Sequence, residues 1–418
     1  MNRVVITGIG AVTPVGRDAE SSWQGLRSGR SGVQRIDFYD VSSFPIQIAG
    51  ICSDFELEQL PDPDAAEYLH RGERYGVAAG AEAIRSAGLQ DSPYEPGEIG
   101  VAIGGSVDRP ELQEFSDAFE VRARSDGHEM HRFPAIKTLR DSQNTAAMQI
   151  ARLAGADGPM IGVSTACTAS AHSIGEAFRL IQDGEARAML AGGFDALTSW
   201  CDLLGFSLLG ALTSEYNDDP ERASRPFDKD RSGFVLGEGS VVMVLEDRDS
   251  ALERGAEVHA ELRGYASSMN AYRMTDPPPD GGGAVIAMNA ALKEAGLGTK
   301  DVDYVVAHAT STPMGDISET TAIKRVFGDE SQNIVVTSPK SMVGHTTCAA
   351  SALNLLAGIY AMRDSVVSPT INVDNQDPEC DLDCVPNSAR EMDVNVVLVN
   401  GFAFGGTNGA LVATKAEA

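Results

Sequence analysis

The stretch "GVSTACTASAHSIGEAF" at residues 162–178 decides the fold, because an apolar run turns here into a helix within a few small residues. A strand that ends near Ser164 and a helix that begins near Ala166 form a strand–turn–helix unit, which is typical of layered α/β proteins. The turn holds one thiol, Cys167, among alanine, serine and threonine. Two interpretations of this thiol are open: a nucleophile at a helix N-terminus, or a small hydrophobic residue that fills the core.

Short runs of β-branched residues recur on both sides of this stretch. Several of them show no alternation of apolar and polar residues, which indicates strands that are covered on both faces. The expected strands lie at 3–7, 99–104, 159–164, 186–193, 302–309, 333–338 and 394–401. Helical periods separate them, such as the stripe of Ile174, Ala177, Phe178 and Ile181. The alternation predicts an α/β layered fold of two similar halves, with a site at the carboxyl ends of the strands.

The segment "TDPPPDGGG" at 275–283 interrupts this alternation. Three prolines exclude a helix and three glycines free the backbone, so the segment is expected to be a loop. Its position in the chain places it near the junction of the two halves.

Composition limits the classes of partner. The 418 residues carry a formal net charge of −27, which disfavours nucleic acid and anionic membrane surfaces as partners. No signal sequence and no run of about 18 apolar residues is evident, so we expect a soluble cytoplasmic protein without a membrane span. The six cysteines are scattered and are expected to be free thiols, and Cys380 and Cys384 lack the second ligand pair that a zinc site needs.

Cys167 has the surroundings of a nucleophile. Unpaired backbone N–H groups at the start of a helix favour a thiolate, and the same groups can stabilise a developing oxyanion. Such a thiol needs partners that move protons or donate hydrogen bonds near neutral pH. Of the seven histidines, His308 and His345 each follow an apolar strand where small polar residues begin, as Cys167 does. These two histidines are therefore the candidate partners.

Four other motifs carry weaker signals. "GIGAVTPVG" at 8–16 lacks the glycine spacing of a dinucleotide site, and "GFAFGGTNGA" at 401–410 predicts a tight turn after a strand. Asp316 and Glu319 have the spacing of a capping box, so we interpret both as residues that start a helix rather than as an acid and a base. The charged loop "RPFDKDRSGFVLGEGS" at 225–240 is expected to hold structural ion pairs.

Taken together, the sequence resembles the elongating, decarboxylating β-ketoacyl-acyl-carrier-protein synthases over essentially its whole length. The segments that carry the resemblance occur in family order: "VVITGIGAVTPVG", "STAC", "ASRPFDKDRSGFVLGEG", "AHATSTPMGD", "SPKSMVGH" and "NGFAFGGTNG". The resemblance implies a thiolase-like fold in which two similar α/β halves form a five-layered αβαβα unit. It places the nucleophile in residues 1–254 and both catalytic histidines in residues 255–418, and it implies a dimer.

The resemblance also implies a role for particular residues. Cys167 is similar to the acyl-accepting nucleophile, His308 and His345 to the histidines that bind the malonyl thioester, and Lys340 to the lysine that orders the second histidine. Phe404 is similar to a gating phenylalanine whose N–H completes the oxyanion hole with that of Cys167. The residues at substrate-binding positions are Thr275, Thr310 and Thr312, which match the phosphopantetheine site, and Phe206, which matches the wall of the acyl pocket.

The implied reaction is a decarboxylative Claisen condensation in fatty-acid or polyketide biosynthesis. An acyl group is transferred from its carrier protein to Cys167, and malonyl-carrier protein then loses CO₂ and attacks it. No metal or redox cofactor is implied, because the substrates are carried on the phosphopantetheine of acyl carrier protein. The implied partners are acyl carrier protein and either a second copy or a chain-length-factor-like homologue.

The chain departs from the family pattern in several places. Ala309 stands for the usual glycine, Asn354 for a glutamate, Arg273 for a histidine and Gly210 for a carrier-docking arginine. We therefore expect any basic docking patch at other residues, namely Arg71, Arg74, Arg132 and Lys137. These departures favour the catalytic ketosynthase subunit of a type II polyketide synthase. The alternative is a non-catalytic subunit like the chain-length factor, against which Cys167 argues.

Overall fold

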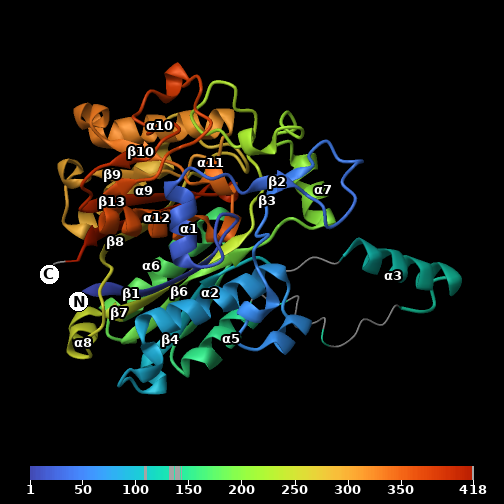
Figure 1. The fold of residues 1–418 in the computed structure, drawn as a ribbon, viewed down its shortest axis with the longest axis horizontal. Helices are drawn as coiled ribbons and strands as arrows, with labels where there is room; N and C mark the ends of the chain where they lie inside the picture. The colour runs from blue at the N-terminus through green and yellow to red at the C-terminus, as the bar shows by residue number, and fades with distance from the viewer. Residues whose placement is uncertain (108–110, 131–135, 137–141, 143, 417–418) are drawn as a thin grey trace.

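The chain uses one pattern of strands and helices twice, as the computed structural model shows for residues 1–107, 111–130, 136, 142 and 144–416 (Figure 1). In the first half the strands of the main sheet are β1 (Val4–Val12), β4 (Ile99–Gly104), β5 (Met160–Val163), β6 (Ala188–Asp195) and β7 (Gly239–Asp247). In the second half they are β8 (Ala260–Met269), β9 (Tyr304–Val306), β10 (Val335–Thr337), β13 (Val396–Phe402) and β14 (Thr407–Lys415). Two small two-stranded sheets are formed by β2 (Val33–Arg35) with β3 (Ile48–Gly50) and by β11 (Val366–Val367) with β12 (Arg390–Glu391).

The helices follow the same repetition. Those of the first half are α1 (Ala19–Arg27), α2 (Arg71–Ala87), α3 (Leu112–Arg124), α5 (Asn144–Ala154), α6 (Ala169–Gln182), α7 (Trp200–Leu209) and α8 (Arg248–Glu253). Those of the second half are α9 (Gly282–Ala295), α10 (Pro313–Phe327), α11 (Lys340–Val343) and α12 (Ala350–Asp364). In the first half α1 follows β1, α5 precedes β5 and α6 precedes β6. In the second half α9 follows β8, α10 precedes β10 and α12 precedes β13. The repetition makes α6 and α12 equivalent elements.

The two sets of five strands join into a single hydrogen-bonded sheet. Its order is β10-β9-β13-β14-β8-β1-β7-β6-β4-β5, so each set has the same internal order. The sets meet where β1 and β8 run antiparallel through three residue pairs, from Val4 with Leu262 to Ile6 with Ala260. In the first set β4 is parallel to β5 and β6, and β6 is antiparallel to β7. In the second set β9 is parallel to β10 and β13, and β13 is antiparallel to β14.

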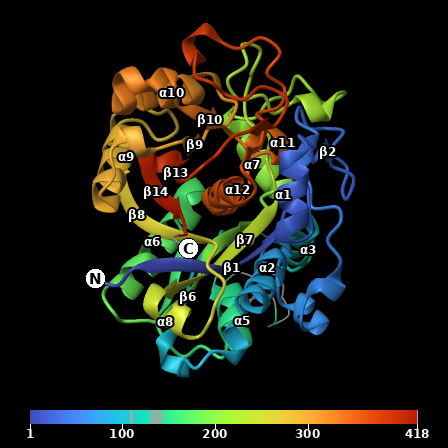
Figure 2. The ribbon, with the colours of Figure 1, turned by 60° about the vertical axis from the view of Figure 1, so that its left-hand side comes forward.

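Helices cover both faces of this sheet in layers. The helices α2 and α5 pack on the outer face of the first set, and α9 packs on the outer face of the second set with α10 against it. Between the sets lie α6 and α12, which contact each other and strands of both halves. Figure 2 looks nearly along α12, which lies between β13 and β14 on one side and β7 on the other. The expected α/β layering is therefore present, with the largest apolar core around the two central helices.

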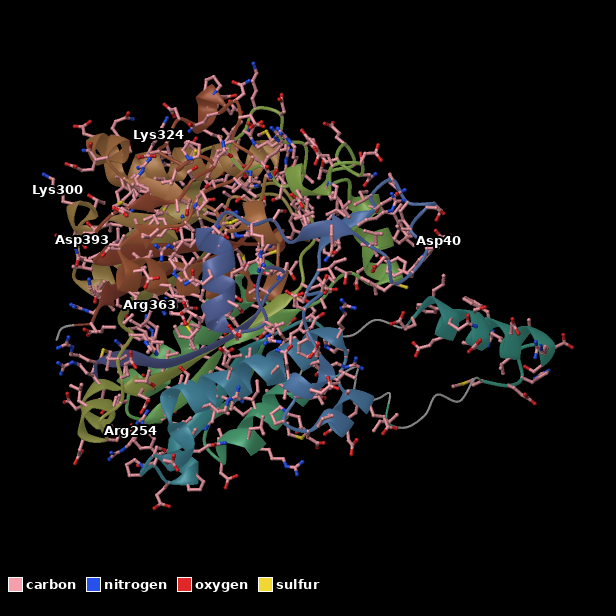
Figure 3. The ribbon with its side chains drawn as sticks, viewed as in Figure 1. Asp40, Arg254, Lys300, Lys324, Arg363 and Asp393 are labelled. Atoms are coloured by element: carbon pink, nitrogen blue, oxygen red, sulfur yellow. The ribbon has the colours of Figure 1, made fainter. Side chains whose placement is uncertain are left out.

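Two features lie outside this layered body or at its surface. The helix α3 projects away from the body (Figure 1), and none of its residues is buried. Charged side chains such as Lys300, Lys324 and Asp393 lie at the outer edge of the second half (Figure 3). No helix within the described parts of the chain is long and apolar enough to cross a membrane.

The chain passes from the first set of strands to the second between α8 and β8, where we propose the boundary at residues 254 and 255. The prediction for the 275–283 segment is only partly correct. The segment is a loop up to the start of α9, but it lies within the second half and not at the junction. Its location matters for function because part of it borders the cavity described below.

The contact between β1 and α2 depends on a glycine and yields a prediction. A Cβ at Gly10 would lie 2.0 Å from the carbonyl oxygen of Ala79 in α2. This clash is with the backbone, so the movement of a flexible side chain cannot relieve it. We expect Gly10→Ala to lower the free energy of unfolding by about 1–3 kcal/mol or to prevent folding. The matched control is Gly97→Ala, because a Cβ at Gly97 meets no atom within 4 Å. Equal unfolding midpoints for the two variants would contradict this packing.

Candidate active site

A cavity of about 640 Å³ opens between the two halves, at the ends of the central helices. Residues from both halves line it, including Asp195 and Phe234 from the first half and Phe402 from the second. The predicted site residues that line it are Cys167, Phe206, Thr275, His308, Thr310, Thr312, His345 and Phe404. Lys340 is the exception, because it is buried but does not line the cavity. The structure thus brings together side chains that are up to 237 residues apart, from Cys167 to Phe404.

Cys167 lies in a tight 3₁₀ turn, Ala166–Thr168, directly before α6. The turn requires a positive φ of 49° at Ala166, a conformation that costs an alanine about 1 kcal/mol or more. Burial raises the pKa of the Cys167 thiol to about 12; the Lys340 ammonium lowers it, the Asp195 carboxylate raises it, and the backbone N–H groups of Cys167 and Phe404 lower it. The thiol is therefore protonated at neutral pH, and its reaction requires a neighbouring group that accepts a proton.

His345 follows α11, where Gly344 turns the chain with a φ of 69°. Its Nδ1 accepts a hydrogen bond from the backbone N–H of Thr347 at 3.2 Å, so we infer that a neutral ring carries its proton on Nε2. Burial lowers the pKa of His345 well below its ordinary value, and the Lys340 ammonium lowers it further. His345 is thus a neutral imidazole with an Nε2–H group to donate.

His308 stands just after β9, and its ring meets that of His345. The ring centroids are 5.2 Å apart and the planes are 82° apart. Burial, Lys340 and His345 together lower the pKa of His308 well below its ordinary value. Its Nδ1 is buried and has no hydrogen-bond partner among the described residues. Two neutral imidazoles therefore lie side by side on one wall of the cavity.

The prediction that Asp316 and Glu319 act at a helix start is only partly correct. Asp316 lies in the first turn of α10, whereas Glu319 lies beyond that turn. The helix α10 begins at Pro313 with Thr312 as its N-cap, and both carboxylates are buried behind the loop that carries His308. Glu319 accepts the backbone N–H groups of His308 at 2.9 Å and Ala309 at 2.6 Å. Asp316 accepts those of Ser311 at 3.1 Å and Phe227 at 2.9 Å.

These two carboxylates fix the position of the His308 loop. Burial raises the pKa of Asp316 to about 7 and raises that of Glu319, while the backbone hydrogen bonds lower both values. Sequence reasoning missed this role because the spacing of both residues also fits a helix start. The available signal was the position of Glu319, eleven residues after a histidine at a strand end.

Aromatic side chains surround the histidines. Phe234 packs against His345 at 5.5 Å between ring centroids, and Phe402 packs against His308 at 5.6 Å. Phe206 and Phe404 contact Phe234 at 5.9 and 6.4 Å. Sequence analysis selected Phe206 and Phe404 but missed Phe234, which lies in the loop it assigned to structural ion pairs. These rings cover the histidines and contribute to the burial that lowers the histidine pKa values.

Lys340 has an unusual environment. Its Nζ has no hydrogen-bond partner among the described residues. Burial lowers the pKa of Lys340 to about 8, although Glu319, Cys167 and Asp316 raise it. Asn354 donates to the carbonyl oxygens of Ala307 at 2.9 Å and Asn400 at 3.4 Å, and offers no charge to the lysine.

The three threonines lie at different depths. Thr310 and Thr312 are half-buried, and their hydroxyl oxygens are 3.0 Å apart. Thr275 is exposed at the mouth of the cavity. A path from the surface to Cys167 therefore passes hydroxyl groups at its outer end.

The predicted docking arginines are engaged inside the protein. Arg71 forms an ion pair with the buried Glu238 at 2.9 Å, and its guanidinium lies over the ring of Phe38. Arg74 donates to the carbonyl oxygens of Leu69 at 3.0 Å and Ala66 at 2.7 Å. The other two predicted residues, Arg132 and Lys137, lie outside the described residues.

A second thiol, Cys348, also lines the cavity. Its sulfur lies 3.4 Å from the Ser106 hydroxyl, and its backbone N–H donates to Asp195 at 3.1 Å. Burial raises the pKa of Cys348 well above its ordinary value, and Asp195 raises it further. Within the described residues no group of three or more His, Cys, Asp or Glu side chains is placed to hold a metal ion.

Comparison with known proteins agrees with this geometry. Residues 1–251 match the model of the beta-ketoacyl synthase N-terminal domain, and residues 259–374 match that of the C-terminal domain. The chain is 40% identical to 3-oxoacyl-[acyl-carrier-protein] synthase 2 of Vibrio harveyi over 99% of this chain and 98% of that protein. It is 41% identical to the enzyme of the same name from Synechocystis sp., again over 99% and 98% of the two chains.

Solved structures show the same fold over the full length of both chains. A beta-ketoacyl synthase from Burkholderia phymatum STM815 superposes with a TM-score of 0.90 at 33% identity. The ishigamide ketosynthase/chain length factor superposes with a TM-score of 0.88 at 34% identity. AntDE:AntF, a type II polyketide synthase acyl-carrier protein in complex with its ketosynthase, gives 0.88 at 32% identity. The prediction of a thiolase-like fold is confirmed, and the chain belongs to the beta-ketoacyl synthase family of acyltransferases.

Proposed function

We propose that this protein is a ketosynthase that condenses an acyl group held on Cys167 with malonyl-carrier protein, giving a β-ketoacyl-carrier protein in fatty-acid or polyketide biosynthesis. The proposal rests on one observation: the Cys167 thiol and two neutral imidazoles, those of His308 and His345, line a single cavity between the halves. The names of the relatives support it. The presence of this thiol and of both imidazoles in one cavity also argues against a non-catalytic chain-length-factor-like subunit, which would not need them.

The first step loads the acyl group. The Cys167 sulfur attacks the carbonyl of an acyl thioester, a neutral imidazole accepts the thiol proton, and the backbone N–H groups of Cys167 and Phe404 stabilise the oxyanion. The carbon–sulfur bond to the carrier breaks, and the carrier thiol leaves with a proton. The acyl-enzyme is held in the cavity that Phe206, Phe234 and Phe404 line.

The second step forms the carbon–carbon bond. The Nε2–H of His345 donates to the thioester carbonyl of malonyl-carrier protein, and His308 lies beside it to share this role. The bond to the malonyl carboxylate breaks, CO₂ leaves, and the electron pair forms an enolate. The enolate carbon attacks the acyl carbonyl on Cys167, and the carbon–sulfur bond to the enzyme breaks. The Cys167 thiolate leaves and takes up a proton from solvent, so the products are a β-ketoacyl thioester, CO₂ and the regenerated thiol.

The proposed partners follow from this chemistry. Both substrates arrive on the phosphopantetheine of acyl carrier protein, which passes Thr275, Thr310 and Thr312 on its way to Cys167. The reaction as written balances without a metal or redox cofactor. A related ketosynthase solved with a chain length factor supports a dimeric assembly, with a second copy or with a homologue. A related ketosynthase solved with its acyl-carrier protein supports that carrier as a partner. A cytoplasmic location stays a prediction.

The role of Cys167 yields the first test of this function. Incubation with an acyl-carrier protein should add the mass of one acyl group to the wild type, as measured by intact mass spectrometry. Cys167→Ala should show no adduct because the attacking sulfur is gone. Cys348→Ala is the matched control and should load normally. An adduct that depends on Cys348 rather than Cys167 would contradict the assignment.

The histidines give a second prediction. His308→Ala and His345→Ala should each lower malonyl decarboxylation by about 10²–10³-fold, since one donor to the developing enolate is lost. Release of labelled CO₂ measures this step, and the denaturant unfolding midpoint of the same samples serves as the control for folding. A variant that decarboxylates at the full rate would exclude its histidine from the proposed role.

The unpaired lysine gives a prediction about stability. The pKa of Lys340 is lowered from 10.5 to about 8, so between these pH values the unfolded chain binds a proton that the folded chain has released. The contribution of Lys340 to stability therefore rises from pH 8 to pH 10.5, and below pH 8 the buried ammonium costs about 3 kcal/mol. We expect Lys340→Met to be more stable than the wild type at pH 7 in denaturant unfolding, and the difference to shrink toward pH 10.5.

Asn354→Glu is the companion variant for this measurement. A carboxylate at this position should raise the pKa of Lys340 and flatten the pH dependence relative to the wild type. A difference between wild type and Lys340→Met that stays constant with pH would show that the ammonium is not destabilised in the folded protein.

A further inference from the structure

Four polar side chains meet on one part of the cavity wall. Asp195 ends β6 and Ser106 follows β4 by two residues. Thr347 and Cys348 begin the 3₁₀ turn that precedes α12. All four line the cavity that holds Cys167. Ser106 is half-buried and the other three are buried. We refer to Ser106, Asp195, Thr347 and Cys348 as the polar cluster.

The Asp195 carboxylate organises the polar cluster. One of its oxygens accepts hydrogen bonds from the Ser106 hydroxyl at 3.1 Å, from the Cys348 N–H at 3.1 Å and from the Thr347 hydroxyl. The other oxygen accepts the Ala196 N–H at 3.1 Å. A carboxylate has about four lone-pair sites, so these four donors fill them. Turning either hydroxyl proton toward the cavity would leave a buried carboxylate short of a donor, which is unfavourable. Both hydroxyl protons are therefore held by Asp195.

The two hydroxyl groups consequently act on the cavity as hydrogen-bond acceptors. A hydroxyl oxygen that donates its one proton still has two lone pairs. The Cys348 sulfur lies 3.4 Å from the Ser106 oxygen, so it takes up part of the accepting capacity of Ser106. Thr347 is therefore the less engaged acceptor of the two. A ligand that fits the polar cluster must bring a hydrogen-bond donor, because the hydroxyl protons are already used.

The polar cluster lies next to the nucleophile. The turn that holds Thr347 and Cys348 packs against the turn Ala166–Thr168, which holds Cys167. The Asp195 carboxylate is close enough to raise the pKa of the Cys167 thiol. An acyl group bound to the Cys167 sulfur therefore begins beside these side chains. Only two carbons separate C3 of such a chain from the sulfur, so a substituent on C3 lies within reach of the cluster.

We propose that the polar cluster selects an acyl group with a hydroxyl on C3, a 3-hydroxyacyl group, as the group that Cys167 receives. The inference rests on the proposed function, because it names the acyl substrate of that same site. A 3-hydroxyl donates its proton to the Thr347 oxygen, whereas a 3-oxo oxygen only accepts hydrogen bonds and a saturated C3 does neither. A chain without a donor covers the hydroxyl oxygens and gives them no hydrogen bond in return.

The loading step keeps the form given above. The Cys167 sulfur forms a bond to the acyl carbon, and the carbon–sulfur bond of the donor thioester breaks. The donor thiol leaves with the proton that Cys167 gave up, and the 3-hydroxyl keeps its own proton. The polar cluster changes the rate of this step only through its hydrogen bond to the acyl chain.

The test compares acyl groups of one short chain length on free pantetheine: saturated, 3-oxo, and the (R)- and (S)-3-hydroxy forms. Loading of Cys167 is followed over time by intact mass. We expect one hydroxy enantiomer to load faster than the other and faster than the saturated group by ~2–10-fold, the range for one net hydrogen bond. The two enantiomers have the same intrinsic reactivity, so a difference between them reports an acceptor held in a fixed position by Asp195.

Thr347→Val removes the acceptor and keeps the shape of the side chain. It should bring the rates of the two enantiomers together, and Thr347→Ser, which restores the hydroxyl, should keep them apart. Because Asp195 also acts on Cys167, a change at Thr347 can alter loading of every acyl group. The ratio of the two enantiomers cancels that general effect.

Thr320→Val is the matched control. Thr320 is a buried threonine of α10 that does not line the cavity, so this variant should keep the enantiomer ratio of the wild type. Equal rates for the two enantiomers in the wild type, faster loading of the saturated group than of both, or an unchanged ratio in Thr347→Val would each overturn the inference. The first two comparisons need only the wild type, so they decide the matter even where Thr347→Val does not fold. A wild type that loads none of the acyl groups would instead overturn the proposed function, whereas loading of the saturated group alone would leave that function intact and overturn the inference.

Discussion

The close approach of α6 and α12 at their N-terminal ends is the constraint on which the site depends. The backbone N–H of Ala352 donates to the Ser170 hydroxyl at 3.1 Å, which links the two helix starts directly. A Cβ at Gly193 would lie 2.6 Å from the Cys348 carbonyl oxygen, so only a residue without a side chain permits β6 to pass behind the turn. Small residues therefore allow the turns of the two strand–turn–helix units to pack against each other. Because each unit ends its strand at the same edge, the chemistry of both halves converges on one cavity.

The repetition of the fold gives two thiols at equivalent positions, and their surroundings make them different. Cys167 and Cys348 each occupy the middle of a 3₁₀ turn that precedes a central helix. Burial raises the pKa of Cys348 well above the ordinary value, and the Asp195 carboxylate raises it further. Burial and Asp195 also raise the pKa of Cys167, but the Lys340 ammonium and the backbone N–H groups of Cys167 and Phe404 lower it. The backbone supplies two candidate nucleophiles, and electrostatics favours one of them.

Sequence patterns predicted the features that depend on local structure. They failed for contacts between residues that the fold brings together from different segments of the chain. His308 and His345 were found because each follows an apolar strand, and strand ends share an edge. The expected strand at 302–309 is shorter in the structure, where β9 ends at Val306. The Ala307 N–H still donates to the Thr337 carbonyl oxygen of β10, but the N–H groups of His308 and Ala309 donate to Glu319 and not to a neighbouring strand. The same contacts explain why assigning both carboxylates to a helix start was incomplete. Their spacing to the helix start is visible in the sequence, whereas their hydrogen bonds to a loop folded back over the helix are not.

The burial of the cavity side chains accounts for their protonation states and has a cost in stability. A histidine that is protonated near neutral pH cannot accept the proton of the thiol. Burial keeps both rings neutral, but it also raises the pKa of Cys167 and disfavours the charged form of Lys340. In the proposed reaction Cys167 is therefore deprotonated as it attacks. Asn354 adds no charge that could offset this cost, because its amide is neutral and donates to the carbonyl oxygens of Ala307 and Asn400. The burial that keeps both imidazoles neutral for their proposed role thus also lowers folding stability through the Lys340 ammonium.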